Sequence, residues 1–491
     1  MPSLTQIGTS GIKDSAVTTV KIANNAVTDA KSNINVSPAA VSDQGNTSTG
    51  AFDIPAGTTA QRPSSPDNGY IRYNTDTDTT EIYAEGVWGK VSPLTPVLSS
   101  ITGVIINTLA QNLTLSGQNF LTANLVVTFT PAGGSASTVT VTPSSDTAAT
   151  VAVPSAIYGQ NAGTVIAITV TNSDLRTSSI VNKTVRALPS GGTVIVDGSE
   201  RTHIFKASTT NFVVPTEITL SNVEYLVVAG GGGGGGNFRG AGGGAGGLLT
   251  SVTGDTPSSN SGSVQSKLTL TAGTYTMNVG AGGPGVQYTL GTDGGNSTIV
   301  NPSSTALVTA IGGGAGGPYG GTGNSGGSGG GSGGHTSSNP NPGSGTSGQG
   351  NDGGDGNTGG AQCGGGGGGA GAAGVNGGSG GTAGDGGNGV ISTIITAAEA
   401  TSNNVGEVVG SDVYFAGGGG AGAYGTGNNF PIGGLGGGAD GYHGDAPYAN
   451  GPNASHPNTG GGGGGSSGTS NTLGTGGTGA DGVIIIRYTL S

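Results

Sequence analysis

The sequence contains few charged residues, which make up 8% of its 491 positions, against about a quarter in ordinary soluble domains. Lys and Arg number 14 against 26 Asp and Glu, which gives a formal net charge of -12. Proteins that bind nucleic acid need clustered Lys and Arg to displace counterions from the phosphates. We therefore expect this chain neither to bind nucleic acid nor to dock on an anionic membrane.

Cysteine and long apolar segments are also scarce. Cys363 is the only cysteine, so the chain can form neither an internal disulfide framework nor a thiolate metal site. The longest apolar runs, such as Val483–Ile486, are far shorter than a membrane span, so we expect no membrane insertion. Residues Met1 to Leu4 carry no basic stretch before an apolar core, so we expect no secretory signal. A polar composition with few charges is common among proteins that act outside cells. A protein made in a cytoplasm without an export signal could reach the outside when the cell lyses.

The first segment carries a short internal repeat. The sequence IKDSAVTT at 12–19 recurs ten residues later as IANNAVTD at 22–29. A ten-residue period does not fit a heptad, and two such units cannot cover their own apolar side chains without neighbours. Identical chains wound together would supply that cover, and a flexible arm that orders only on docking is the alternative. We predict that residues 1–50 form an N-terminal attachment arm.

The sequence pattern of residues 51–92 predicts a small β-unit. Asn68-Gly69 precedes an alternating strand, and Ala84-Glu85-Gly86 joins two further strands as a hairpin turn would. The sequences GTTAQRP at 57–63 and NGYIRYNTD at 68–76, followed by Trp88, resemble a short module common in tail-fibre and appendage proteins of tailed bacteriophages. The resemblance covers about a tenth of the chain. It implies a small trimeric β-unit, and therefore a homotrimeric fibre.

Residues 93–188 show an all-β pattern. Short strands are expected at regular spacing, over 113–120, 125–129, 138–142, 150–153 and 165–171, as in a β-sandwich of about one hundred residues. The sequence LTLSGQNF at 113–120 is similar to the Ig-like fold of transcription-factor and plexin-type domains. In phage structural proteins this resemblance implies a spacer, and a carbohydrate-binding decoration is the alternative.

Residues 189–491 are dominated by glycine, and most of the 109 glycines follow Ala229. Apolar strands enter Gly blocks and Gly blocks lead back into strands, which predicts a β-structured base with Gly-rich excursions. Disorder is the first alternative for such a composition, and collagen is excluded because Gly does not recur at every third residue. In polyglycine II, extended helices without Cβ atoms approach closely enough to pair their N–H and C=O groups. The return of each excursion to a strand favours polyglycine II.

The glycine-rich half resembles the domains at the ends of phage tail fibres and adhesins. The opening VEYLVVAGG from Val223 and the closing GADGVIIIRY up to Tyr488 carry the match. The resemblance implies that loops at the tip contact a receptor on the host, either a surface glycan or an outer-surface protein. The excursion 312–389 has no apolar return within it, so the number of helices it forms is left open.

Residue patterns that would indicate catalysis are weak. Gly-x-Gly-x-x-Gly matches follow from composition alone, and His203, His335, His443 and His456 lack zinc-ligand spacing. Asp76 and Asp78 are better explained by a solvated turn than by a cation site. Paired glycosidase carboxylates would need a rigid groove, and the sequence indicates none. We expect no enzyme activity, no catalytic residues, no cofactor and no metal.

Aromatic residues are the better binding candidates, because rings give large contact area at a small entropic cost. The segment 423–458 is rich in them, and four prolines stiffen it. A simple capping role for some of these rings is the equal alternative. The predicted receptor-binding residues are Tyr424, Phe430, Tyr442, His443, Tyr448 and His456. The Ser-, Asn- and Pro-rich segment from His335 to Asn351 is a second possible tip.

Together these features predict a mainly β, multidomain fibre with very little helix. It comprises an arm (1–50), a small β-hairpin module (51–92), an Ig-like β-sandwich (93–188) and a β-base with a polyglycine II tip (189–491). We expect an external appendage of a virion whose arm is held by another virion protein and whose tip recognises the host surface. The alternative is a purely structural capsid or tail decoration without a receptor. An ice- or surface-binding polyglycine protein is disfavoured, because it would not need the module at 57–88.

Overall fold

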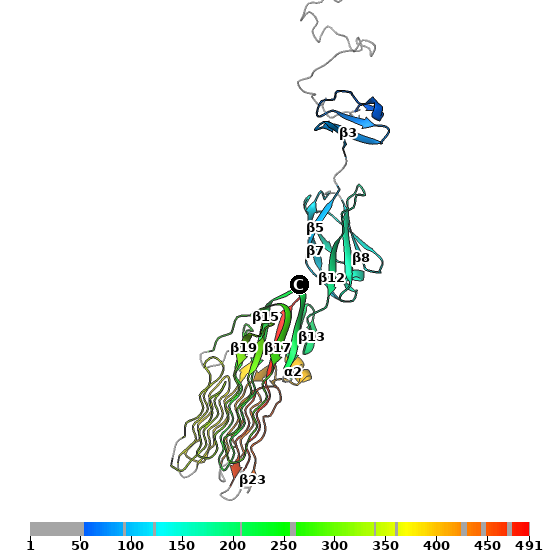
Figure 1. The fold of residues 1–491 in the computed structure, drawn as a ribbon. Helices are drawn as coiled ribbons and strands as arrows, with labels where there is room; N and C mark the ends of the chain where they lie inside the picture. The colour runs from blue at the N-terminus through cyan, green and yellow to red at the C-terminus, as the bar shows by residue number, and fades with distance from the viewer. Residues whose placement is uncertain are drawn as a thin grey trace, which may run out of the picture. The chain divides into compact units, whose positions relative to one another are not determined.

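The computed structural model describes residues 54–91, 95–120, 124–206, 209–255, 262–337, 340–358, 362–423, 430–442, 448–468 and 474–490. The chain divides into two compact units, residues 1–93 and 94–491, and each is described by itself. The described residues contain two short α-helices, α1 (Ser155–Tyr158) and α2 (Ala397–Asn403), among many strands (Figure 1). The prediction of a mainly β, multidomain chain with little helix is confirmed. The predicted arm, 1–50, lies outside the described residues.

The first unit contains a four-stranded sheet in the order β1-β2-β3-β4. The short strand β1 (Ala56–Gly57) is parallel to β2 (Ile71–Asn74), and the other pairs are antiparallel. The strands β3 (Thr79–Ala84) and β4 (Val87–Lys90) are joined by Glu85 and Gly86, both with positive φ, as a type I′ turn requires. The hairpin predicted at this turn is therefore confirmed.

The buried side chains of this first sheet are polar. Arg72, Asn74 and Glu81 are at most 5% exposed, and no hydrophobic residue described between 54 and 91 is buried. Glu81 pairs with Arg62 at 2.6 Å and with Arg72 at 3.5 Å, and it accepts a hydrogen bond from Asn74 Nδ2 at 3.1 Å. The hydrogen bond from Arg62 lowers the pKa of Glu81. This face is therefore held by an ion-pair network in place of an apolar core.

Residues 97–186 form a β-sandwich of two sheets, with orders β10-β7-β5 and β6-β12-β11-β8-β9. Inward residues alternate with outward ones, as in β8, where Leu125, Val127 and Phe129 are fully buried. The strands predicted between 113 and 171 are confirmed by β7 to β11. The bounds are β5 (Val97–Thr102), β6 (Ile105–Ile106), β7 (Asn112–Gln118), β8 (Leu125–Pro131), β9 (Ser137–Val141), β10 (Ala148–Ala152), β11 (Val165–Thr171) and β12 (Val181–Arg186).

The remainder of the second unit is built on an eight-stranded sheet in the order β13-β14-β25-β15-β17-β18-β19, with β16 paired to β15. The last strand in sequence, β25, lies between β14 and β15, so the start and the end of this region meet in one sheet. The bounds are β13 (Thr193–Asp197), β14 (Glu200–Phe205), β15 (Thr209–Val228), β16 (Leu248–Thr250), β17 (Leu268–Asn278), β18 (Ser297–Val300), β19 (Ala306–Ala310) and β25 (Val483–Thr489).

Alternate residues of β25 enter two different hydrophobic clusters. Ile484 and Ile486 belong to the cluster that includes Phe212 and Tyr275. Val483 and Ile485 pack with residues around α2 and a three-stranded sheet of order β20-β22-β21. The bounds of that sheet are β20 (Val390–Ile391), β21 (Glu407–Val409) and β22 (Asp412–Phe415). The eight-stranded sheet is thus covered on both faces, which explains its nearly continuous apolar run at 483–486.

A fully buried histidine connects the start of this sheet to its last strand. His203 Nδ1 lies 2.7 Å from the carbonyl oxygen of Gly191, and Nε2 lies 2.9 Å from the hydroxyl of Tyr488. Burial lowers the pKa of His203, so the neutral ring is favoured. Both ring nitrogens are satisfied, and His203 is a structural residue rather than a binding one.

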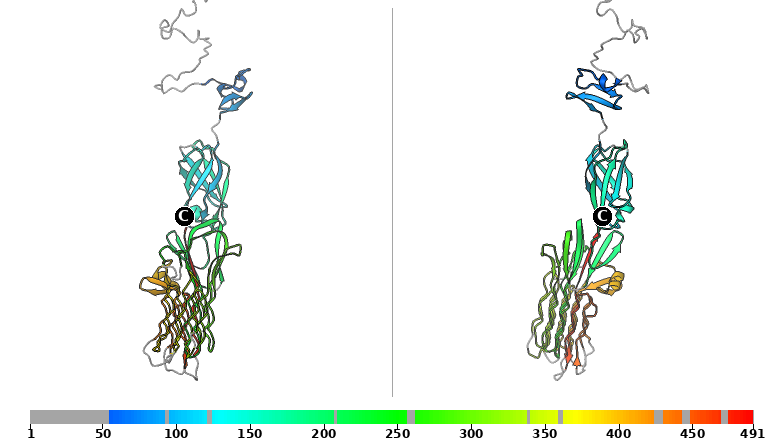
Figure 2. Two further views of the ribbon diagram at one scale, coloured as in Figure 1. Left: turned by 90° about the vertical axis from the view of Figure 1, so that its left-hand side faces the viewer. Right: turned by 45° about the vertical axis from the view of Figure 1, so that its right-hand side comes forward.

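The Gly-rich excursions run back and forth beside one another from this sheet (Figures 1 and 2). We call them the glycine stack, which comprises the described parts of 229–247, 280–296, 311–389 and 416–482. Along 230–235, each N–H donates to a neighbouring run at 2.8–3.0 Å. The three neighbours alternate in a fixed order: 292–295 for Gly230 and Gly233, 477–480 for Gly231 and Gly234, and 241–244 for Gly232 and Gly235. A period of three without internal hydrogen bonds is the geometry of an extended three-residue helix, as expected for polyglycine II.

The run 230–235 also lies close to three further runs, on the sides where Cβ atoms would be. A Cβ on Gly230 to Gly235 would lie 2.0–2.3 Å from carbonyl oxygens of runs 281–284, 461–464 and 314–317. Hydrogen bonds and close contacts thus surround one run with six neighbours. Only glycine permits this approach of backbones, which explains why the interior contains so few other residues.

The long excursion 312–389 crosses the stack repeatedly without returning to the sheet. The N–H groups of Asn324 and Gly327 donate to Ala315 and Gly312, which makes these runs antiparallel. Gly314 and Gly317 donate to Ser328 and Gly331, which makes that pair parallel. The sequence did not indicate how many extended helices the segment 312–389 forms. The successive runs are 312–317, 321–327, 329–334, 340–345, 350–358, 362–369, 372–377 and 383–389.

Asp and Asn side chains satisfy N–H groups at the surface of the stack. Several occur as pairs three residues apart, which places both members on the same side of a three-residue helix. The pairs Asp293 and Asn296, Asp385 and Asn388, and Asn450 and Asn453 accept N–H groups of adjacent runs at 2.8–3.0 Å. These side chains take the place of a missing neighbour, so the stack ends without unpaired N–H groups at these positions.

Candidate functional site

The candidate site is the end of the glycine stack that lies away from the eight-stranded sheet, which we call the distal end. The short strand β23 (Tyr448–Ala449) marks it in Figure 1, where it pairs with β24 (Ser467–Gly468). The N–H of Gly468 donates to the carbonyl oxygen of Phe238 at 3.2 Å. The turn at 237–239 therefore lies at the same end as β23.

Three aromatic rings from three different turns meet at the distal end. The centroids of Phe238 and Tyr319 are 5.6 Å apart in an edge-to-face arrangement, and those of Tyr319 and His335 are 5.0 Å apart. The Arg239 guanidinium lies over the Tyr319 ring at 5.4 Å from its centroid and also donates to Gln362 Oε1. We call these five residues the distal aromatic cluster.

The distal aromatic cluster combines rings, a planar cation and an amide on a rigid support. All its members except Gln362 are partly exposed. Ring faces and guanidinium groups suit the flat faces of sugars and of protein side chains. Among the described residues, no group of three or more His, Cys, Asp or Glu is placed to hold a metal ion. The residue types in the distal aromatic cluster fit the binding of another molecule's surface.

The structure places the predicted receptor-binding residues at different positions. Phe430 is 66% exposed, and Tyr442 is partly buried, with its N–H donating to Gly465 at 3.1 Å. Tyr448 belongs to β23 at the distal end. Tyr424 and His443 lie outside the described residues.

His456 lies apart from the other predicted residues, at the end of the stack beside α2. The neighbouring Asn458 Nδ2 donates to the carbonyl oxygen of Asn404 at 2.9 Å, directly after α2. His456 Nδ1 is 4.0 Å from Glu407 Oε2, and the same carboxylate accepts the N–H groups of Gly436 and Gly437 at 2.7 and 2.8 Å. The run 449–454 separates His456 from Tyr448, so the two residues cannot share one contact surface.

Sequence reasoning missed Phe238 and Tyr319, and it noted His335 only as the start of a second possible tip. The available signal was local: each aromatic residue interrupts two Gly blocks, in the sequences GNFRGAG and GPYGGTG. Inside the stack even a Cβ atom would clash with the backbone of a neighbouring run, so an aromatic ring does not fit there. An aromatic residue between two Gly runs therefore indicates a turn at the end of the stack. Nothing in the sequence indicates that these turns lie next to one another.

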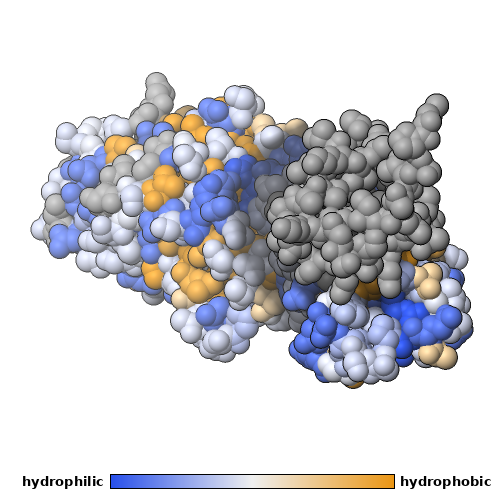
Figure 3. Space-filling model, turned by 90° about the horizontal axis from the view of Figure 1, so that it is seen from above, coloured by the Kyte–Doolittle hydropathy of each residue, from blue (hydrophilic) through white to orange (hydrophobic). Residues whose placement is uncertain are grey.

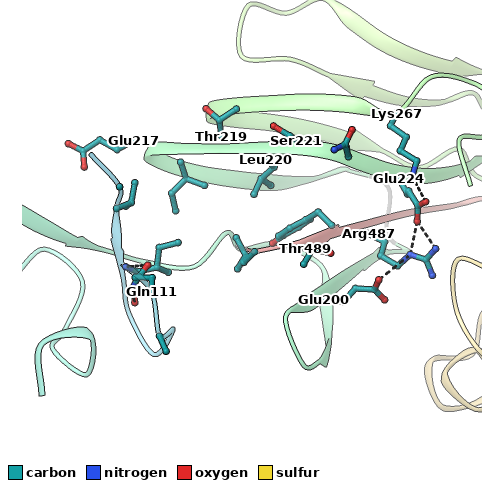
Figure 4. A pocket seen from close by; sticks show the side chains of 18 of the residues that line it. Gln111, Glu200, Glu217, Thr219, Leu220, Ser221, Glu224, Lys267, Arg487 and Thr489 are labelled. Carbon is teal, nitrogen blue, oxygen red and sulfur yellow. Dashed lines mark hydrogen bonds and ion pairs between the residues drawn. The ribbon is translucent and has the colours of Figure 1, made fainter. Parts of the chain in front are cut away.

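A hollow of about 1020 Å³ lies between the sandwich residues 103–112 and the eight-stranded sheet (Figure 4). Glu224 contacts Lys267 Nζ at 2.8 Å and Arg487 Nε at 2.8 Å. Burial opposes ionisation of Glu224, but the hydrogen bonds from Lys267 and Arg487 outweigh it and lower its pKa. The opposite charges of Glu224, Lys267 and Arg487 are paired with one another, so we interpret this group as a structural contact between strands and not as a ligand site.

Hydrophobic residues on the face shown in Figure 3 form small groups separated by hydrophilic residues. Among the described residues visible in this view, no single extended apolar area is seen, as is usual for the surfaces of soluble proteins. Within the described ranges, no helix is long and apolar enough to cross a membrane.

One comparison with known proteins matches the region that contains the glycine stack and its sheet. A comparison with curated proteins found no match. The model of a protein family described as "Glycine-rich domain" matches residues 206–489, from the end of β14 to the end of β25. The match spans more than half of the chain, and the chain therefore belongs to this glycine-rich domain family.

Proposed function

We propose that this chain is a homotrimeric virion fibre protein of a tailed bacteriophage whose glycine-rich domain recognises the host cell surface. The resemblance of residues 57–88 to tail-fibre modules supports the assignment to a fibre. In this proposal the arm 1–50 is held by another virion protein, and the sandwich is an Ig-like spacer. The receptor is a host glycan or outer-surface protein.

The observation that carries the recognition role is the distal aromatic cluster. Binding residues are commonly placed on turns that a rigid scaffold positions. The glycine stack is such a scaffold, since its backbone is hydrogen-bonded from run to run and its interior contains few side chains larger than those of Ala and Ser. The cluster gathers Phe238, Tyr319 and His335 from turns that are distant in sequence.

Labelled full-length chain is expected to bind saturably to cells of the strains on which its virion grows. The double variant Phe238→Ser, Tyr319→Ser should bind at least about tenfold more weakly, because aromatic anchors carry most of the energy of such contacts. A second variant, with Tyr424→Ser, Tyr442→Ser and Tyr448→Ser, tests the sequence-predicted loop. Flow cytometry with increasing concentrations of labelled chain gives the apparent affinities.

Leu175→Ser is the matched control, because Leu175 is 85% exposed and lies in the sandwich. It should leave binding unchanged. Thermal unfolding of each variant separates a loss of contact from a loss of fold. If the folded chain binds none of these strains, the proposal of host recognition is wrong, and the purely structural decoration is favoured.

The homotrimer is supported by the apolar face of the first unit. Ile71, Val87 and Val91 are 47%, 65% and 50% exposed, and Ile71 pairs with Ile82 on the face opposite Glu81. The described part of this unit, residues 54–91, is small and has no buried apolar residue, so by itself it lacks the core that independent stability requires. Copies of the same face, packed together, would supply that core.

The full chain is therefore expected to sediment as a trimer, and the double variant Ile71→Ser, Val87→Ser as a monomer or a weakened trimer. Analytical ultracentrifugation at several concentrations measures this. The same substitutions should leave the glycine stack folded, since that stack finds its hydrogen-bond partners within one chain. A monomeric mass for the unmodified chain at micromolar concentration would refute the trimer.

A further inference from the structure

One side of the glycine stack carries exposed apolar residues between carboxylates. Val375 and Ile432 are 51% and 59% exposed, and Phe430, on the run of Ile432, is 66% exposed. Tyr288 is the one other large hydrophobic residue with comparable exposure in the described part of the stack. The remaining surface of the stack is largely Gly, Ser, Thr and Asn, so this grouping is not what the composition of the stack would produce.

Hydrogen bonds fix the order of these residues across the surface. The N–H of Val375 donates to the carbonyl oxygen of Asp385 at 2.9 Å. Asp385 Oδ1 in turn accepts the N–H of Ile432 at 2.8 Å, and Asp440 Oδ1 accepts the N–H of Gly433 at 2.9 Å. The runs 372–377, 383–389, 430–435 and 438–442 are therefore adjacent in that order. Apolar and acidic residues alternate across them, and we call this surface the lateral strip.

The charge around the lateral strip has one sign. The sequence contains no Lys or Arg between Leu268 and Ile486, whereas Asp and Glu recur throughout this segment. Asp385 and Asp440 each accept one N–H from an adjacent run, and a carboxylate has about four acceptor positions. The carboxylates can therefore bind cationic groups of a partner without breaking the stack.

We propose that the lateral strip binds a protein segment in which apolar side chains alternate with or adjoin Lys and Arg. The exposed Val375, Ile432 and Phe430 side chains would be removed from water by the partner's apolar residues. Asp385 and Asp440 would pair with its cations, which adds specificity and speeds association. A polyanion such as a phosphorylated or carboxylated glycan would be repelled. This inference rests on the strip alone and does not depend on the distal aromatic cluster.

Three labelled ten-residue peptides test the proposal by fluorescence anisotropy with the full chain: alternating Lys and Leu, alternating Lys and Ser, and alternating Glu and Leu. The Lys-Leu peptide is expected to bind, and the other two to bind at least tenfold more weakly. Val375→Ser with Ile432→Ser should weaken binding of the Lys-Leu peptide at least tenfold. Asp385→Asn with Asp440→Asn should weaken it several-fold and reduce its dependence on salt, while Asn keeps the acceptor for the adjacent N–H.

Leu175→Ser and Asp197→Asn, exposed positions outside the glycine stack, are the matched controls and should leave binding unchanged. Unchanged binding in the Val375→Ser, Ile432→Ser variant would overturn the proposal. Equal binding of the Lys-Ser peptide would also overturn it, because attraction would then be purely electrostatic. Stronger binding of the Glu-Leu peptide or of heparin would show a preference for anionic partners and would likewise contradict it.

Discussion

Gly234→Ala is expected to lower the free energy of unfolding of the glycine-rich domain by at least about 3 kcal/mol, the upper part of the usual range for overpacking. An added Cβ would lie 2.0 Å from the carbonyl oxygen of Gly464 and 2.6 Å from its carbon. Both atoms are backbone, and the run 461–464 is itself hydrogen-bonded to other runs. Neither run can shift without disturbing its neighbours, so the strain cannot be relieved locally.

The measurement is thermal unfolding by calorimetry, with amide hydrogen exchange to locate the effect in the stack. Gly380→Ala is the matched control, because no atom lies within 4 Å of an added Cβ at Gly380. It should change stability little, since Ala reduces the entropy of the unfolded chain relative to Gly. If Gly234→Ala melts like Gly380→Ala, the close packing of the runs is wrong.

Asp255→Ala is expected to cost about 3–5 kcal/mol of stability, because the buried hydroxyls of Thr250 and Ser392 lose their acceptor, at about 1–3 kcal/mol each, and the two hydrogen bonds from Thr393 are lost as well. Asp255 is 5% exposed, and its two carboxylate oxygens accept four hydrogen bonds. The donors are the hydroxyls of Thr250, Ser392 and Thr393 and the N–H of Thr393, at 2.6–3.0 Å. The carboxylate thus joins β16 to the segment before α2, and its removal leaves buried donors unsatisfied.

Urea unfolding of the Asp255 variants measures this cost. Asp255→Asn keeps one carbonyl oxygen for Thr393, so its loss should be smaller, about 1–3 kcal/mol. Asp197→Asn, on an exposed strand residue, serves as the control for loss of one negative charge. A loss for Asp255→Ala no greater than that of Asp197→Asn would mean that these buried hydrogen bonds do not hold the segment in solution.

Strands could be predicted from sequence wherever apolar residues recur with a strand period. Strands end at Val228, Asn278, Ala310 and Phe415, within two residues of the change from apolar to Gly-rich sequence. The same holds for the returns into β16, β18, β20 and β25. Polyglycine II could also be anticipated, because it is the way in which a Gly-rich segment satisfies its backbone while burying almost no side chains.

The buried ion pairs of the first unit could not be predicted, because Arg and Glu in short strands are usually exposed. Glu81 and Arg72 are buried because the segment that carries Arg62 folds over that face of the sheet. The distal aromatic cluster was also beyond sequence reasoning. Phe238 and Tyr319 follow two Gly runs that strands β16 to β19 separate in the sequence, and the Gly runs themselves carry few side chains that could specify which runs adjoin.

The sequence by itself determined the local conformations: strands from apolar alternation, a hairpin from Glu85-Gly86, and close-packed extended helices from Gly without Cβ atoms. Only the tertiary structure decided which runs are neighbours, how often 312–389 crosses the stack, and which side chains meet at its distal end and along the lateral strip. The physical reason is that backbone hydrogen bonds between glycines are alike at every register. The order of the runs is therefore fixed by what surrounds them: the strands that anchor their ends, the lengths of the turns, and the Asp and Asn side chains that close the surface of the stack.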